Sequence, residues 1–299
     1  MALITAIALV AVVTSAQSLD DVVVTGTVAQ VRTLIEQGAD VNVRDADGIV
    51  PLMRAASAGR SDIVRELLAG GADPSVKTSG GVTALMMASL GGYADAMAPL
   101  LARKPDVNAR DAQGRTALMA AASSGVTAAL RALLDAGADV TVEDATGGTA
   151  LTYAAAEGHS GAVDVLRRRG AKPGSTELIL AAGRCNTDVV AAFLRDGMPV
   201  DTPDATTTPL IAAAGGHCTD IVNLLIARGA NLNARNGEGW TPLIKAAAAG
   251  HADVVETLLA HGADMSIADP SGRTAWTYAA MANRADIAEM FRRARERKQ

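Results

Sequence analysis

The sequence predicts an all-α fold, a solenoid of about nine helix-turn-helix units joined by protruding hairpin fingers. A block of about 24 residues recurs at a spacing of 33, and its cleanest copy runs from Thr241 to Asp264. Self-similarity at a fixed period of roughly 20 to 50 residues indicates a repeat architecture. Hydrophobic residues make up 49% of the chain but aromatic residues only 2%, so alanine and leucine must fill the core, as stacked helix pairs allow.

The units cover residues 17–299 almost completely. With Thr241 as the first position of its unit, they start near residues 17, 50, 83, 116, 149, 176, 208, 241 and 274. Most steps are 33 residues, but the step from 149 to 176 is 27 and the next is 32. We therefore expect a short, irregular connector at residues 171–175. Because it cannot hold a full hairpin, we expect a gap in the row of fingers near Pro173 and Gly174.

The first helix of a unit begins with threonine, as in Thr241-Pro242. Threonine is favoured as the N-cap of a helix and proline at its first position. Paired small residues such as Ala246-Ala247 follow and let neighbouring helices approach closely. The threonine, the proline and the alanines all indicate a packed helix and no chemistry.

The second helix carries an acidic residue in its first turn, which is favourable against the helix dipole. Val254, Leu258 and Leu259 follow at helical spacing and predict its buried stripe. A glycine ends the helix because glycine adopts the left-handed conformation without steric cost. The acids are Asp62, Asp95, Asp188, Asp220, Asp253 and Asp286. The glycines are Gly38, Gly71, Gly137, Gly170, Gly197, Gly229 and Gly262.

Between units, connectors such as 236–240 place a turn residue and a glycine at fixed offsets, which predicts a hairpin. Together the segments read D-x-x-G-x-T-P-L, A-A-x-x-G-H and L-L-x-x-G-A-D. In this pattern the chain resembles the ankyrin repeat family over about residues 17 to 294. The resemblance implies a protein-binding module that has no catalytic activity.

The resemblance also implies that partners bind on the concave side, formed by the fingers and the first helices. On the first helices, the candidate partner-binding residues are Arg54, Tyr153, Lys245 and Tyr278. On the fingers they are Arg44, Asp47, Ile49, Gln113, Arg115, Glu238, Trp240 and Arg273. Trp240 is the foremost of these because tryptophan is enriched among interface hot spots. The alternative is that Trp240 packs against the neighbouring finger.

The chain starts with an apolar stretch from Ala2 to Val13, followed by Thr14-Ser15-Ala16. This pattern is typical of a secretory signal peptide at residues 1–16. The stretch is shorter than the roughly 20 residues that span a bilayer, so we expect cleavage after Ala16 and no stable membrane insertion afterwards. The protein would then be periplasmic or secreted. The alternative is an additional helix packed on the first unit.

Export would permit a disulfide between the two cysteines, Cys185 and Cys218. Both lie in the turn between the helices of their units, and these units are consecutive. Packed helices lie about 8 to 10 Å apart, whereas bridged cysteines need Cα atoms roughly 4.4 to 6.8 Å apart. A bridge therefore requires the two turns to lean together, and two free thiols are the alternative.

Charge and motif content exclude several function classes. A net charge of -5 and a pI near 5.4 argue against a general nucleic-acid surface. The four histidines are scattered, and no phosphate loop, nucleophile elbow or H-E-x-x-H occurs. We predict no catalytic residue, metal or cofactor. We expect a monomeric scaffold or regulator of an envelope protein, with a toxin-neutralising protein and a redox protein using Cys185 and Cys218 as alternatives.

Overall fold

The computed structural model describes residues 18–202, 204 and 206–296. The predicted signal peptide at residues 1–16 lies outside the described residues, as does Gln17. Within these ranges the chain forms 18 helices, and the only β pairing is in two isolated bridges. The all-α repeat fold predicted from the sequence is confirmed.

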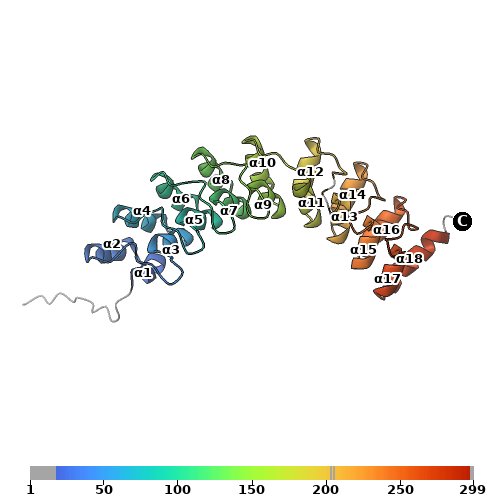
Figure 1. Cartoon of the computed structure of the whole chain (residues 1–299), viewed down its shortest axis with the longest axis horizontal. Helices are drawn as coiled ribbons and strands as arrows, with labels where there is room; N and C mark the ends of the chain where they lie inside the picture. Colours follow the sequence, from blue (N-terminus) through green and yellow to red (C-terminus); the bar gives the residue numbers. More distant parts are fainter. Residues whose placement is uncertain (1–17, 203, 205, 297–299) are drawn as a thin grey trace, which may run out of the picture.

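The helices alternate between two layers of an arch. Figure 1 shows the odd-numbered helices on the inner, concave side and the even-numbered helices on the outer side. The inner helices are α1 Leu19–Thr25, α3 Pro51–Ser57, α5 Ala84–Leu90, α7 Ala117–Ser124, α9 Ala150–Ala156, α11 Ser175–Gly183, α13 Pro209–Gly215, α15 Pro242–Ala249 and α17 Ala275–Met281. The outer helices are α2 Val28–Glu36, α4 Ser61–Ala69, α6 Ala94–Leu101, α8 Thr127–Asp135, α10 Ser160–Arg168, α12 Thr187–Arg195, α14 Thr219–Ala227, α16 Ala252–Ala260 and α18 Ala285–Glu296.

Threonine caps most inner helices, as the sequence predicts. The hydroxyl of Thr241, for example, accepts a hydrogen bond from the backbone N–H of Ile244. The sixth unit differs, because α11 begins at Ser175 and the expected cap, Thr176, lies inside the helix. Here Gly174 is the N-cap, and its N–H donates to the Glu177 carboxylate at 2.8 Å. The side chain of Glu177 thus replaces the threonine cap and lets the helix start earlier.

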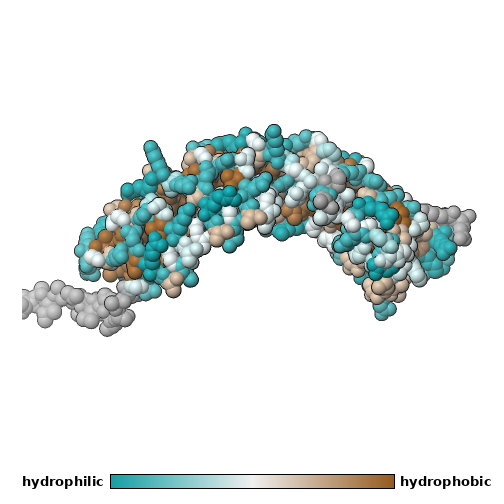
Figure 2. Space-filling view, in the orientation of Figure 1, coloured by the Kyte–Doolittle hydropathy of each residue, from teal (hydrophilic) through white to brown (hydrophobic). Residues whose placement is uncertain are grey.

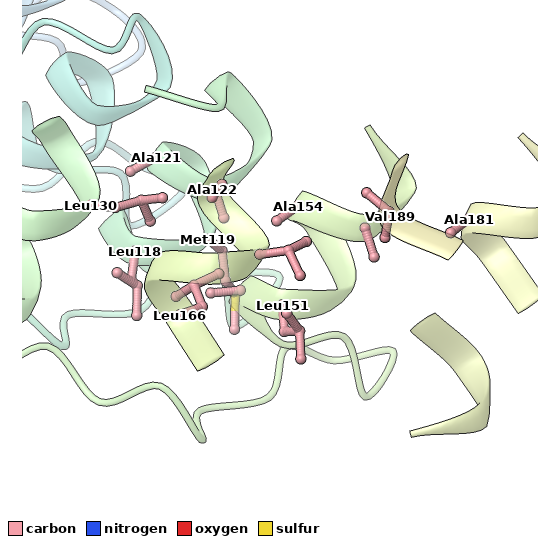
Figure 3. Packing of buried hydrophobic residues seen from close by; sticks show 14 of the residues in the cluster. Leu118, Met119, Ala121, Ala122, Leu130, Leu151, Ala154, Leu166, Ala181 and Val189 are labelled. Carbon is pink, nitrogen blue, oxygen red and sulfur yellow. The ribbon is translucent and has the colours of Figure 1, made fainter. Parts of the chain in front are cut away.

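The hydrophobic core extends along the whole array instead of forming one centre. The leucine at the third position of the unit is at most 3% exposed in units two to eight. Figure 3 shows Leu118 and Met119 of α7 close to Leu151 of α9, with alanines between the helices. Burying a leucine side chain stabilises the fold by about 1.5 to 3 kcal/mol. Each unit therefore depends on its neighbours for its core.

The fingers are built around a carboxylate at their base. Asp45 Oδ1 accepts hydrogen bonds from the backbone N–H groups of Asp47 and Ile49, at 2.9 and 2.8 Å. The same pair of bonds recurs at Asp111, Asp144, Asn236 and Asp269. Neighbouring fingers are joined through the backbone, as where the N–H of Ala112 donates to the carbonyl of Gly80. The fingers thus form a row of short hairpins on either side of residues 171–174.

Residues 171–174 run from α10 to α11 without a hydrogen-bonded hairpin. Side chains bridge the two units there instead. Thr152 Oγ1 donates to Glu177 Oε1 at 2.6 Å, and Asn186 Nδ2 donates to the carbonyls of Ala155 and Ala156, each at 2.8 Å. Stacking of the fifth and sixth units therefore relies on these polar bridges where a finger contact is lacking.

None of the helices in the described ranges combines the length and the apolar character needed to span a bilayer.

Candidate functional site

The concave side of the arch is hollowed along its length, as the space-filling view shows (Figure 2). Hydrophobic residues visible in this view occupy separate small areas among hydrophilic ones. The inner helices and the fingers supply the side chains of this concave surface. Most of the predicted partner-binding residues lie on it in three groups, one in each third of the array.

The group in the last third stacks two aromatic rings between two cations. The rings of Trp240 and Tyr278 lie 4.8 Å apart between centroids, tilted by 56°. Lys245 Nζ lies 5.2 Å from the Trp240 ring, and the Arg273 guanidinium lies 4.9 Å from the Tyr278 ring. Trp240 therefore packs on Tyr278 of α17 and is half-buried. Part of its surface remains exposed on the concave side. Its neighbours Lys245, Tyr278 and Arg273 are all among the residues predicted to bind a partner.

A buried carboxylate anchors this group. Asp269 Oδ2 accepts a hydrogen bond from Tyr278 Oη at 2.6 Å and pairs with Arg273 at 3.0 Å. The hydrogen bond from Tyr278, together with those from Arg273 and Ser271, lowers the pKa of Asp269 to about 2. The carboxylate is 2% exposed and the Arg273 side chain 41%. A partner would thus meet the cation of this pair.

The middle group also contains a tyrosine and an arginine that bind finger carboxylates, but here the two carboxylates belong to different fingers. Tyr153 Oη donates to Asp144 Oδ2 at 2.6 Å, and Arg115 pairs with Asp111 at 2.8 Å. Burial opposes ionisation of Asp144, but hydrogen bonds from Tyr153, Thr146 and Gly148 outweigh it and lower the pKa of Asp144 to about 2. Burial and the bond to Asp144 raise the pKa of Tyr153 to about 12.

The group in the first third contains one cation between two acids. Arg54 pairs with Asp45 of the first finger at 2.6 Å and with Asp20 of α1 at 3.2 Å. Its guanidinium occupies the place that the tyrosine hydroxyl takes in the two other groups. Arg54, Tyr153 and Tyr278 therefore share one structural role, which is to bind the carboxylate of their own finger.

The remaining predicted residues do not join these groups. Arg44 donates to the carbonyl of Lys77, 3.3 Å away in the next finger. Ile49 is half-buried and packs on the core. The side chains of Asp47, Gln113 and Glu238 are exposed near the finger tips. Of these, Gln113 Oε1 accepts a weak hydrogen bond from Arg115 at 3.3 Å.

The sequence reasoning missed the finger carboxylates and an apolar cavity. Asp144 and Asp269 each precede their tyrosine by nine residues, a spacing that could have identified the pair. The cavity, of about 190 Å³, lies against α5 and α7 and is lined by Met87, Leu90 and Met119 with Arg115 and Tyr153. Leu90 is 63% exposed. The lining is apolar because Met87 stands at the unit position where other units carry Arg54 or Tyr153. Leu90 likewise stands where other units carry Ser57 or Ser123.

Cys185 and Cys218 form a disulfide, with their Cα atoms 4.9 Å apart. Their position follows from a column of contacts between consecutive turns. In most units the turn contains a left-handed glycine, and a side chain of the next unit covers it, as Tyr93 covers Gly59 and His159 covers Gly125. Cys185 holds the glycine position, with φ of 61°, and Cys218 holds the covering position. The turns do lean together here, as they do where Tyr93 covers Gly59 and His159 covers Gly125.

The next contact in the column is made by histidines. His217 also occupies the left-handed position, with φ of 61°, and its ring stacks on His251 at 4.3 Å. His217 Nε2 lies 2.7 Å from Asp253 Oδ1. Among the described residues no group of three or more histidine, cysteine or acidic side chains is placed to hold a metal ion. The histidines thus take part in the packing of consecutive turns.

The family model described as ankyrin repeats (3 copies) matches residues 22–111, 94–177, 169–236 and 211–296. The chain belongs to the ankyrin repeat family. Among solved structures, the crystal structure of human ASB11 ankyrin repeat domain is similar, with 29% sequence identity and a TM-score of 0.68. That match covers 72% of this chain and 99% of the other. Comparison with curated proteins gave no match.

Ankyrin repeats are generally protein-protein interaction modules, and their fold is typically a binding scaffold without catalytic activity. The fold by itself does not specify which surface of this ankyrin repeat protein is used. The side chains of the concave surface are therefore the basis for a functional assignment.

Proposed function

We propose that this ankyrin repeat protein is a monomeric, non-catalytic module that binds another protein through its concave surface. Its role would be that of a scaffold or regulator of an envelope protein. The residues proposed to contact the partner are those of the three concave groups together with the exposed finger residues: Arg44, Asp47, Ile49, Arg54, Gln113, Arg115, Tyr153, Glu238, Trp240, Lys245, Arg273 and Tyr278.

The observation that carries the proposal is the stack of Lys245, Trp240, Tyr278 and Arg273. Aromatic and arginine side chains dominate the energetics of protein interfaces. In this stack the rings are already held in place by neighbours and by Asp269. A partner would therefore bind without having to order these side chains, which lowers the entropic cost of association.

We propose that the protein acts outside the cytosol, in the periplasm or as a secreted protein. Two observations support this location. Residues 1–16 have the composition of a signal peptide, and the turns of the sixth and seventh units are joined by a disulfide. Such bonds persist mainly in oxidising compartments.

The experiment is a pull-down from envelope extract with residues 17–299 as bait, comparing Trp240→Ala with Trp276→Ala. Trp276 is the matched control because it is 53% exposed and lines a separate hollow on the last unit, with Met265 and Phe291. We expect one partner that binds the wild type and Trp276→Ala but is lost with Trp240→Ala. Loss of a hot-spot residue weakens binding by about 2 kcal/mol or more, roughly thirtyfold.

Because Trp240 also packs on Tyr278, folding of each variant must be measured by thermal unfolding. Trp240→Phe keeps an aromatic ring on Tyr278 and separates loss of packing from loss of binding. A variant with unchanged partner binding but a much lower Tm would assign Trp240 to packing alone and overturn its place in the binding surface. If Trp276→Ala loses the partner as completely as Trp240→Ala does, the interface would instead include the last unit of the array.

A further inference from the structure

We infer that the ninth unit carries a second docking surface, which takes an amphipathic helix of another protein. This surface, the end face, lies on α17 and α18 at one end of the arch (Figure 1). The inference goes beyond the proposed function, because the end face is separate from the concave groups. The end face consists of Met265, Trp276, Ala280, Ala288 and Phe291.

Equivalent positions in successive units show which side chains a following unit covers. The third residue of the unit is a leucine in units two to eight and at most 3% exposed there. In the ninth unit it is Trp276, which is 53% exposed. The position of Ala247 is fully buried in units two to eight, whereas its equivalent in the ninth unit, Ala280, is exposed. Both positions need a following unit for burial, and no helix of the described residues supplies it here.

The end face contains an apolar hollow of about 850 Å³, lined by Met265, Trp276 and Phe291. Ala288 also lines it. The equivalent residue in units two to eight is valine, leucine or methionine, and it is fully buried in each. Alanine therefore leaves open a space that a larger side chain fills in the other units.

The first unit shows the opposite solution, a polar residue at a position that lacks a neighbour. The position of Ile63 is fully buried in units two to nine, and in the first unit it is Gln30, which is exposed. A polar outer face on a terminal unit keeps a solenoid soluble. The ninth unit has no such substitution at Trp276 or Ala280, so its end face is suited to binding another apolar surface.

The junctions within the array indicate that a helix covers such a face. In every junction, each inner helix packs on the next inner helix and each outer helix on the next outer helix. The described residues offer no strand to which a partner strand could pair. A hydrophobic groove between helices binds an amphipathic helix whose apolar residues recur at i, i+3, i+4 and i+7. We therefore expect large aliphatic side chains in that stripe, as at the position of Ile63 within the array.

Arg295 determines the charge at the rim of the hollow. It stands at the position of Gly262, the glycine after the preceding outer helix, and α18 continues through it to Glu296. The chain therefore does not turn into a further finger at this position. The glutamates of α18 pair with other arginines of that helix, whereas no acidic group of the described residues pairs with Arg295. An acidic residue beside the apolar stripe of the partner helix would pair with it.

The test uses Trp276 as the reporter. In the Trp240→Phe variant of the 17–299 protein, Trp276 is the single tryptophan, so its emission reports burial of the end face. The probe is a peptide of about 20 residues with leucine along one helical face and alanine, glutamate and glutamine elsewhere. A saturable titration should shift the emission of Trp276 to shorter wavelength. Trp276→Phe, which keeps Trp240, should show no shift.

A scrambled peptide of the same composition has no apolar stripe and should bind about tenfold more weakly or less. Ala288→Glu, made in the Trp240→Phe protein, places a carboxylate in the hollow and should weaken the striped peptide about tenfold or more. Ala260→Glu makes the same change at an exposed position of α16 and should leave the affinity unchanged. Arg295→Gln should weaken binding about two- to fivefold, as expected for an exposed ion pair.

Thermal unfolding checks that Ala288→Glu remains folded, and the comparison of the two peptides does not depend on that variant. The inference is overturned if the striped peptide causes no shift, if the scrambled peptide binds as tightly, or if Trp276→Phe shows the same shift. It is also overturned if light scattering shows a dimer without peptide that Ala288→Glu dissociates, because a second copy would then occupy the end face. None of these results changes the pull-down of a partner that depends on Trp240, so the proposed function is tested separately.

Discussion

At the scale of single residues, the finger carboxylates link folding to function. Asp144 and Asp269 hold the turn of their own finger and also orient a tyrosine of the concave surface. Both carboxylates have a pKa of about 2, so they are ionised at any physiological pH. The tyrosine hydroxyls are then fixed as donors, and their rings are held in one orientation for a partner.

The low pKa of Asp144 predicts a loss of stability in acid. An aspartate in the unfolded chain has a pKa near 3.9, and in the fold it is about 2. The stabilisation from the ionised form is complete above about pH 4 and is lost as pH falls through about 2. Urea unfolding at about pH 6 and about pH 2.5 should show a smaller loss for Asp144→Asn than for the wild type. Asp47→Asn, at an exposed tip, should retain the full acid sensitivity, and equal losses in all three proteins would contradict this.

Glu177 is the second residue whose role was not evident from its type. It is 7% exposed, accepts from Gly174 N–H and from Thr152 Oγ1, and so holds both the start of α11 and the junction to the fifth unit. Glu177→Ala should lower the free energy of unfolding by about 1 to 3 kcal/mol, because the N-cap N–H of Gly174 and the half-buried hydroxyl of Thr152 both lose their acceptor.

Glu157→Ala is the matched control, since Glu157 pairs with Arg184 across the same junction but is exposed. Its loss should cost at most about 1 kcal/mol. If the two variants, compared by urea unfolding, lose the same stability, Glu177 has no special role in bridging the units.

At the scale of the structural element, the turn between inner and outer helices obeys one packing rule. Glycine occupies the left-handed position where a side chain of the next unit lies directly above it. A side chain at this position would clash with that neighbour. The sixth and seventh units break the rule with Cys185 and His217, and there the contact becomes a disulfide and a ring stack.

The column of turns predicts how the disulfide can be replaced. Cys185→Ser with Cys218→Ser loses a cross-link between residues 33 apart, about 3 to 4 kcal/mol on the chain-entropy model, and keeps a side chain at positive φ. Cys185→Gly with Cys218→Asn copies the Gly158 and Asn186 contact of the preceding junction. It should be more stable than the serine pair by about 1 kcal/mol, because glycine relieves the left-handed strain. Urea unfolding of both variants checks the order, and a more stable serine pair would refute the packing rule.

At the scale of the whole molecule, the helices pack from unit to unit along the whole array, but the row of fingers is interrupted between the fifth and sixth units. Backbone bonds join most consecutive fingers, and the Arg235 guanidinium donates to the carbonyl of Ala268 in the last finger, but residues 171–174 provide no bond of either kind to a neighbouring finger. In a solenoid, stability is approximately a sum over units and their interfaces. The junction between the fifth and sixth units is therefore the place where the array can unfold in two parts.

This predicts two transitions in urea. Both tryptophans, Trp240 and Trp276, lie on the C-terminal side of this junction, so their fluorescence reports only the C-terminal part, whereas far-UV circular dichroism reports all helices. We expect the two curves to differ in midpoint. Coincident curves would show that the polar bridges at the junction couple the two parts fully.

The features that follow from the sequence are those set within one unit. The period, the threonine caps, the acids of the outer helices and the glycines after them depend on residues a few positions apart, whose geometry the local chain fixes. Thr176 is the exception, because a buried glutamate from the same helix, held by Thr152 of the preceding unit, took over the cap.

Contacts between units depend on how one unit stacks on the next, over about 33 residues of chain. The pairing of Trp240 with Tyr278, the closeness of Cys185 and Cys218, and the cavity beside Leu90 arise only from that stacking. Residue types alone did not decide whether Cys185 and Cys218 form a disulfide or remain two free thiols. Nor did they decide whether Trp240 is exposed or packed. The rise and lean between units set these distances, because the helices of each unit bury their apolar faces against the next.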